Sequence, residues 1–144
     1  MLIILEGIDK CGKSTFAQKL GPNAVIKHST KDDDAIEVLK KYIPIANEQT
    51  VVLDRSFLSE MTYGPVYRGE MNITPAKLMK ITKLVNSVPH IILYFSRPAN
   101  EKHKYDINDE FEKEPEKLVL VEKKYKEWIS RLKNRFNIYE IQYK

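Results

Sequence analysis

Short apolar runs alternate along the chain with longer stretches in which apolar residues recur every three or four positions. Five runs rich in β-branched or aromatic residues predict strands at residues 2–5, 24–26, 51–53, 91–95 and 138–141. Helical spacing predicts helices at residues 14–20, 33–46, 75–86 and 115–132. Strands that alternate with helices are typical of a parallel sheet covered on both faces. We therefore expect an α/β, three-layer fold with a sheet of about five strands.

The clearest helical pattern lies in residues 115–132. Its apolar positions recur at intervals of three and four and form one stripe, made of Leu118, Val121, Tyr125, Trp128 and Leu132. An aromatic stripe could contact a cofactor, but packing against the sheet is the simpler interpretation.

Three consecutive aspartates, Asp32 to Asp34, stand at the start of the predicted helix 33–46. They could form a metal cluster. The better explanation is an N-cap at Thr30 or Asp32, followed by acidic residues in the first turn.

Composition indicates an ordinary soluble domain. The 144 residues are 42% apolar and 31% charged, which suits one domain with one core. The net charge of +4 fits phosphate-bearing ligands as well as nucleic acid, because basic and acidic residues are mixed along the chain. No apolar run approaches the roughly 20 residues of a membrane span, and the one cysteine, Cys11, has no partner for an intrachain disulfide. We expect a single domain over residues 1–144 in a reduced, cytoplasmic protein without a membrane partner.

Residues 7–14 read GIDKCGKS and match the phosphate-loop pattern GxxxxGK[ST], between a predicted strand and a predicted helix. Glycines let the backbone N–H groups of such a loop point at phosphate oxygens, beside the positive end of the helix dipole. Lys13 would reach the β- and γ-phosphates of ATP, and the Ser14 hydroxyl would bind Mg²⁺. The expected phosphate-binding residues are Gly7, Asp9, Lys10, Cys11, Gly12, Lys13, Ser14 and Thr15.

A second group of polar residues follows the strand predicted at 51–53. Asp54 could be a Walker B carboxylate that holds Mg²⁺ through water, or it could orient an acceptor or take its proton. Arg55 could clamp phosphoryl oxygens as charge develops during transfer. Ser59, Tyr63 and Arg68 follow in a segment that starts at the carboxyl end of this strand, where ligands bind in open parallel sheets.

Structural interpretations of the same residues remain open at this point. Asp54 and Arg55 could form an ordinary surface ion pair. The spacing of Ser59 and Tyr63 also suits helix packing, and Arg68 could simply be solvated.

Two stretches, EGIDKCGKST at residues 6–15 and DRSFLSEMTY at residues 54–63, resemble the thymidylate kinase family. This resemblance implies that Asp9 approaches the sugar of the acceptor and that Arg55 holds the acceptor phosphate. It also implies that Lys10 supplies a positive charge to the transferring phosphoryl group, and that the protein could be a homodimer. Together with the strand-end residues, the expected acceptor contacts are Asp9, Arg55, Ser59, Tyr63 and Arg68.

The rest of the chain resembles this family less closely. Residues 96–116 are polar and mixed in charge, as a lid over phosphates would be, although a solvated loop is the better explanation for Lys102 and Lys104 taken singly. The chain is short for the family, and Gly64 and Pro65 stand where the family often has glutamine. The sequence Asp54-Arg55-Ser56 also partly matches nucleoside kinases. The identity of the acceptor base is therefore open.

Three functions compete on this evidence. The favoured one is transfer of the γ-phosphoryl group of ATP, with Mg²⁺, to a deoxynucleoside monophosphate similar to dTMP. The second keeps this chemistry but takes a deoxynucleoside or a polynucleotide 5′-hydroxyl as acceptor. The third is a P-loop ATPase or switch acting on nucleic acid, with Asp54 as the Walker B residue. A switch needs a water-positioning residue, which is not evident in the sequence.

Lys10 gives a first test. If its charge acts only as the phosphoryl group moves, Lys10→Ala should lower kcat by about 10-fold or more and leave ATP affinity nearly unchanged. Steady-state kinetics and equilibrium ATP binding measure the two quantities separately. Weaker ATP binding with an unchanged kcat would instead make Lys10 a ground-state contact.

Overall fold

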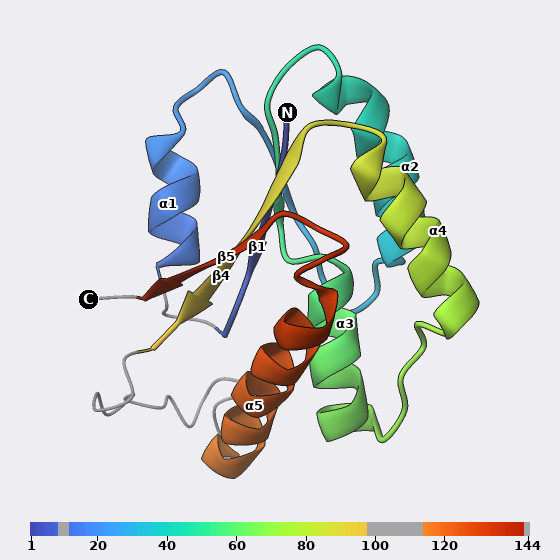
Figure 1. The fold of residues 1–144 in the computed structure, drawn as a ribbon. Helices are drawn as coiled ribbons and strands as arrows, with labels where there is room; N and C mark the ends of the chain where they lie inside the picture. The colour runs from blue at the N-terminus through green and yellow to red at the C-terminus, as the bar shows by residue number, and fades with distance from the viewer. Residues whose placement is uncertain (9–11, 98–113, 143–144) are drawn as a thin grey trace.

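The computed structural model describes residues 1–8, 12–97 and 114–142 (Figure 1). Its strands are β1 (Leu2–Glu6), β2 (Val25–His28), β3 (Val51–Asp54), β4 (His90–Ser96) and β5 (Ile138–Gln142). Its helices are α1 (Lys13–Lys19), α2 (Ala35–Ala46), α3 (Phe57–Tyr63), the π-helical turn η1 (Gly64–Arg68), α4 (Pro75–Asn86) and α5 (Pro115–Leu132). Within these residues, no helix is both long and apolar enough to cross a membrane.

The five strands form one parallel sheet in the order β2-β3-β1-β4-β5. β1 lies at the centre, where Leu5 pairs with Asp54 of β3 on one side and with Leu93 of β4 on the other. α1 lies on one side of the sheet, and α2 and α4 lie on the opposite side (Figure 1). The predicted α/β, three-layer fold is therefore confirmed.

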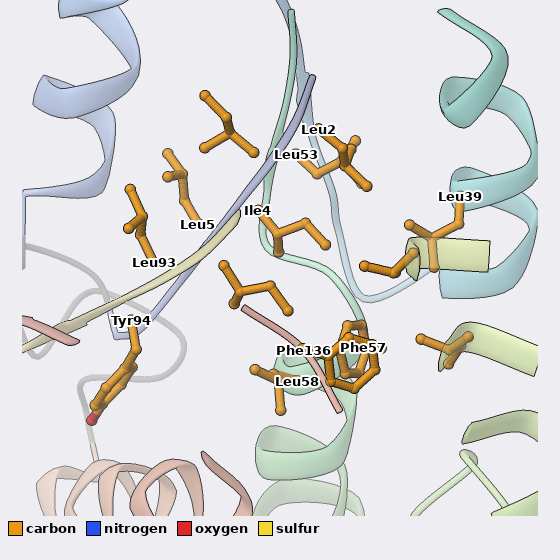
Figure 2. Close-up of a cluster of buried hydrophobic side chains, with 14 of the residues drawn as sticks. Leu2, Ile4, Leu5, Leu39, Leu53, Phe57, Leu58, Leu93, Tyr94 and Phe136 are labelled. Atoms are coloured by element: carbon orange, nitrogen blue, oxygen red, sulfur yellow. The ribbon is translucent and has the colours of Figure 1, made fainter. Parts of the chain in front are cut away.

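The core is built on both faces of β1. Leu2 and Ile4 lie on the side of α2 and α4, whereas Leu5 lies with Leu93 on the side of α1 (Figure 2). The side chains of Leu2, Ile4 and Leu5 are completely buried. A strand covered on both faces must be apolar at successive positions, which explains why its sequence forms a continuous run instead of an alternating pattern.

The sequence analysis did not predict the π-helical turn η1 or the helix directly before it, α3. Five of its seven residues are buried: Phe57, Leu58, Met61, Thr62 and Tyr63. A helix that is buried over most of its surface has no regular polar face, so periodicity does not reveal it.

The prediction for α5 was correct in its bounds. Four of the five stripe residues are buried, and Trp128 is half-buried.

The expected N-cap of α2 was wrong. Asp34, and neither Thr30 nor Asp32, caps the helix, because its Oδ1 accepts hydrogen bonds from the backbone N–H groups of Ile36 and Glu37, both at 3.0 Å. The carboxylate of Asp33 instead closes a turn, in which Thr30 N donates to its Oδ2 at 2.8 Å. The helix therefore begins at Ala35, two residues later than the sequence suggested.

Phe136 gives a test of the core. It is 4% exposed, and its ring centroid lies 5.2 Å from that of Phe57. We expect Phe136→Ala to lower the free energy of unfolding by about 3–5 kcal/mol in urea titrations. The neighbouring exposed Arg135→Ala is the control and should change it by less than about 0.5 kcal/mol. Equal effects of the two variants would contradict the assigned core.

Candidate functional site

The glycine-rich loop leaves the carboxyl end of β1 through backbone conformations that favour glycine. Gly7 has a φ of +132°, and a Cβ atom there would lie 2.5 Å from the carbonyl oxygen of Phe95. Gly12, directly before α1, has a φ of +92°. Both glycines of the phosphate-loop pattern are thus required by the local geometry. The predicted loop residues Asp9, Lys10 and Cys11 lie outside the described residues.

Lys13 is the first residue of α1, and its side chain reaches back to the start of this loop. Its side chain is buried, and its Nζ donates hydrogen bonds to the carbonyl oxygens of Gly7 at 3.0 Å and Ile8 at 2.8 Å. The ammonium group is therefore tied to the backbone that would surround a phosphate. Ser14 and Thr15 follow in the first turn of α1 and are exposed. Their hydroxyl groups are accessible to a ligand or a hydrated cation.

Asp54 ends β3, the strand next to β1. Its Oδ2 lies 2.8 Å from Nδ1 of His28, its register partner on β2. Its Oδ1 is buried and has no hydrogen-bond partner in the described part of the chain. A buried carboxylate oxygen without a partner is costly, so this atom is suited to a hydrated cation.

The available oxygen donors fit Mg²⁺. Among residues 1–8, 12–97 and 114–142, no group of three or more His, Cys, Asp or Glu side chains could hold a metal ion. Magnesium commonly uses one or two protein ligands, several waters and substrate phosphates. The Ser14 hydroxyl and the unsatisfied Asp54 oxygen match that donor set.

Arg55 follows in a left-handed backbone conformation, with a φ of +75°. Such conformations cost on the order of 1–3 kcal/mol outside glycine, and they cluster at functional sites. The Arg55 N–H donates to the carbonyl oxygen of Leu5 at 2.8 Å, which connects the turn to β1. The guanidinium carbon lies 4.9 Å from the ring centroid of Tyr63. The arginine is therefore held at both its backbone and its side chain.

A cavity of about 370 Å³ lies beside this turn. Four of the predicted acceptor residues line it: Arg55, Ser59, Tyr63 and Arg68. Residues 29–33, from the connection between β2 and α2, also line it, as does Tyr67 of η1. The structure thus brings these four residues together, whereas the fifth, Asp9, lies outside the described residues.

Arg68 has a partner that the sequence analysis missed. Its Nη2 lies 2.7 Å from each carboxylate oxygen of Glu60, and the side-chain amide of Asn72 donates to the same carboxylate at 3.1 Å. The positive charge of Arg68 is therefore balanced at the wall of the cavity. Glu60 gave no signal in the sequence, because its pairing with Arg68, eight residues later, depends on η1 continuing directly from α3.

The second missed residue is Glu6, whose carboxylate is completely buried at the end of β1. Oε2 accepts from the backbone N–H groups of Ser56 at 3.2 Å and Ser59 at 3.3 Å. Oε1 accepts from the Ser59 hydroxyl at 2.5 Å and the Tyr125 hydroxyl at 3.2 Å. Burial raises the pKa of Glu6, while hydrogen bonding to Ser59 and the nearby charge of Arg55 oppose that rise. An acidic residue directly after an apolar strand was the available sequence signal.

The predicted lid-like segment, residues 96–116, lies mostly outside the described residues. Ser96 ends β4, residues 98–113 are not described, and α5 begins at Pro115. Arg97 pairs with Glu122 of α5, its Nε lying 3.1 Å from Oε2. The start of this segment is therefore joined to α5.

A parallel sheet of this order, with a glycine loop after its central strand, defines a P-loop α/β fold. No protein-family model matches the chain. It is 26% identical over 106 residues to YorR, an uncharacterized SPβ prophage-derived protein of Bacillus subtilis. The match covers 68% of this chain and spans 63% of the length of YorR.

Solved structures share the fold at low sequence identity. YorR from Bacillus subtilis, in complex with phosphorylated GDP, has a TM-score of 0.69 at 22% identity, with 99% of this chain and 85% of that one covered. Thymidylate kinase from Ehrlichia chaffeensis has a TM-score of 0.58 at 16% identity, with 100% and 87% covered. Deoxyadenosine kinase from M. mycoides has a TM-score of 0.53 at 17% identity, with 99% and 90% covered. The chain therefore has a thymidylate kinase-like fold.

Lys13 gives a direct test of the loop. Because its ammonium group is held at the start of the loop, Lys13→Ala should lower kcat for ATP-dependent phosphoryl transfer by about 100-fold or more. Circular dichroism should show that the fold is retained. Lys19→Ala, which removes an exposed lysine from the last turn of the same helix, should retain normal turnover. A folded Lys13→Ala protein with near-normal turnover would exclude a phosphate loop.

Proposed function

We propose that the protein is a nucleotide kinase that transfers the γ-phosphoryl group of ATP to a deoxynucleoside monophosphate similar to dTMP. The observation that carries this proposal is the position of Arg55. A left-handed turn holds its guanidinium at the wall of a cavity. Strand β1, whose Leu5 carbonyl oxygen accepts from the Arg55 N–H, continues directly into the glycine loop. A donor phosphate and an acceptor phosphate could therefore meet at one edge of the sheet.

Residues of the loop and of β3 would serve the donor. Lys13 would leave its carbonyl partners to contact the β- and γ-phosphates. Ser14 and Asp54 would hold Mg²⁺, which when bound neutralises part of the phosphate charge. Asp54 is already oriented for this task, because His28 holds one of its carboxylate oxygens and leaves the other available.

Arg55 would serve the acceptor. A guanidinium can bind two phosphate oxygens at once, and stacking on the Tyr63 ring limits its movement before the substrate arrives. Lys10 would add a positive charge to the transferring group from the loop. The reaction would be accelerated mainly by positioning and electrostatic stabilisation.

A deoxynucleoside acceptor is the second candidate. The fold is also that of a deoxyadenosine kinase, and Ser56 follows Asp54 and Arg55 as in the nucleoside-kinase pattern. The YorR structure contains phosphorylated GDP, so guanine nucleotides belong among the acceptors tested. A panel of nucleosides and monophosphates with Mg²⁺ and ATP, read for ADP and for the new phosphate ester, should yield a nucleoside diphosphate. ATP hydrolysis without any phosphorylated product would contradict the proposal.

Arg55→Lys separates the two acceptor classes. If the acceptor carries a phosphate, this variant should raise the acceptor KM and lower kcat, because an ammonium cannot reproduce the two-pronged contact. If the acceptor is a nucleoside, the effect should fall on kcat, with the acceptor KM little changed. Asp54→Asn is the companion variant and should impair transfer in both cases. Normal transfer by both variants would exclude this site.

A further inference from the structure

Tyr125 of α5 brings a hydroxyl group into the core beside the candidate site. The residue is completely buried, and its ring stacks on that of Tyr94, with centroids 5.0 Å apart. Its hydroxyl lies 3.2 Å from Oε1 of Glu6 and 3.0 Å from Oγ of Ser59. Stacking alone would be served equally well by phenylalanine, so the polar contact requires its own explanation.

The carboxylate that Tyr125 contacts acts as the cap of α3. Ser56 stands at the N-cap position, but its own side chain makes no capping hydrogen bond. Glu6, the last residue of β1, takes over this role, because its Oε2 accepts from the N–H groups of both Ser56 and Ser59. A buried carboxylate must be fully hydrogen-bonded to be tolerated, and the hydroxyls of Ser59 and Tyr125 satisfy its other oxygen.

This cap lies next to the left-handed turn at Arg55. The N–H of Arg55 is bound by the carbonyl of Leu5, and the N–H of the following residue, Ser56, is bound by Glu6. Two consecutive residues of β1 therefore hold the two amides that flank the Arg55 Cα atom. A left-handed conformation outside glycine persists only where its surroundings fix it, and these two contacts do so.

We propose that Tyr125 is a positioning residue for Arg55, whose hydroxyl holds the Glu6 carboxylate against the left-handed turn. This residue makes α5 part of the support of the acceptor site. The kinetic consequence rests on the proposed function, whereas the effect on the turn itself does not.

Tyr125→Phe removes the hydroxyl and keeps the stacked ring. It should lower kcat by about 10-fold and raise the acceptor KM, since small misplacements of a clamping group have effects of this size or larger, and it should leave ATP affinity unchanged. The Ser56 amide should lose protection in hydrogen–deuterium exchange followed by NMR, because its acceptor is less firmly held. The Ser59 amide should lose less, since it also donates to the carbonyl oxygen of Ser56 at 3.1 Å.

Thr62→Val is the matched control. It removes another completely buried hydroxyl, from α3, whose partners are the carbonyl oxygens of Leu58 and Ser59. This variant should keep the wild-type kcat and acceptor KM, and the protection of the Ser56 amide. Glu6→Gln should have larger effects than Tyr125→Phe on both the kinetics and the protection of the Ser56 amide. The reason is that an NH₂ group would then replace one of the two acceptor oxygens.

The two proposals fail in different ways. If the wild type phosphorylates no nucleotide but Tyr125→Phe still loses amide protection, the proposed function fails and the positioning role stands. If the wild type is active and Tyr125→Phe matches Thr62→Val in kinetics and exchange, Tyr125 serves packing only and the positioning role is overturned.

Discussion

The candidate site depends on a carboxylate that is buried completely at the end of the central strand. Glu6 cannot lie there without hydrogen bonds, and it obtains them from the start of α3 and from α5. Satisfying this group therefore draws three elements together at the position where the glycine loop begins. The same contacts fix the turn at Arg55. Under the proposed function, stability and function are coupled here, because the interactions that make Glu6 tolerable also hold the backbone that carries the Arg55 side chain.

The strand order explains why donor and acceptor groups could meet. β1 lies between β3 and β4, so the loop after β1 and the polar residues after β3 leave the same edge of the sheet side by side. The loop also requires glycine at position 7, where any Cβ would strike the Phe95 carbonyl of β4. Each neighbour of β1 thus has a separate role: β3 supplies Asp54 and leads directly into Arg55, and β4 restricts the path of the loop.

The sequence predicted the sheet and most helices because apolar runs and apolar stripes report burial directly. Helix α3 escaped prediction because burial of most of its surface removes the polar positions that reveal a period. For the site, Gly7, Lys13, Asp54 and Arg55 were predictable from local patterns. Glu6 left only the signal of an acidic residue after an apolar strand, and Glu60 left none, since their importance comes from partners such as Tyr125 and Arg68, which the fold alone brings near. Local spacing carries no information on such contacts.

The central claim is that one site binds a donor triphosphate and an acceptor monophosphate at the same time. Calorimetric titration with Mg²⁺ and a bisubstrate analogue, in which adenosine and thymidine are joined through five phosphates, measures this directly. If both halves are engaged, the Kd should be at least about 100-fold lower than that of ATP, with one analogue bound per chain. An analogue that binds no more tightly than ATP would contradict the claim that the Arg55 cavity receives an acceptor phosphate beside the loop.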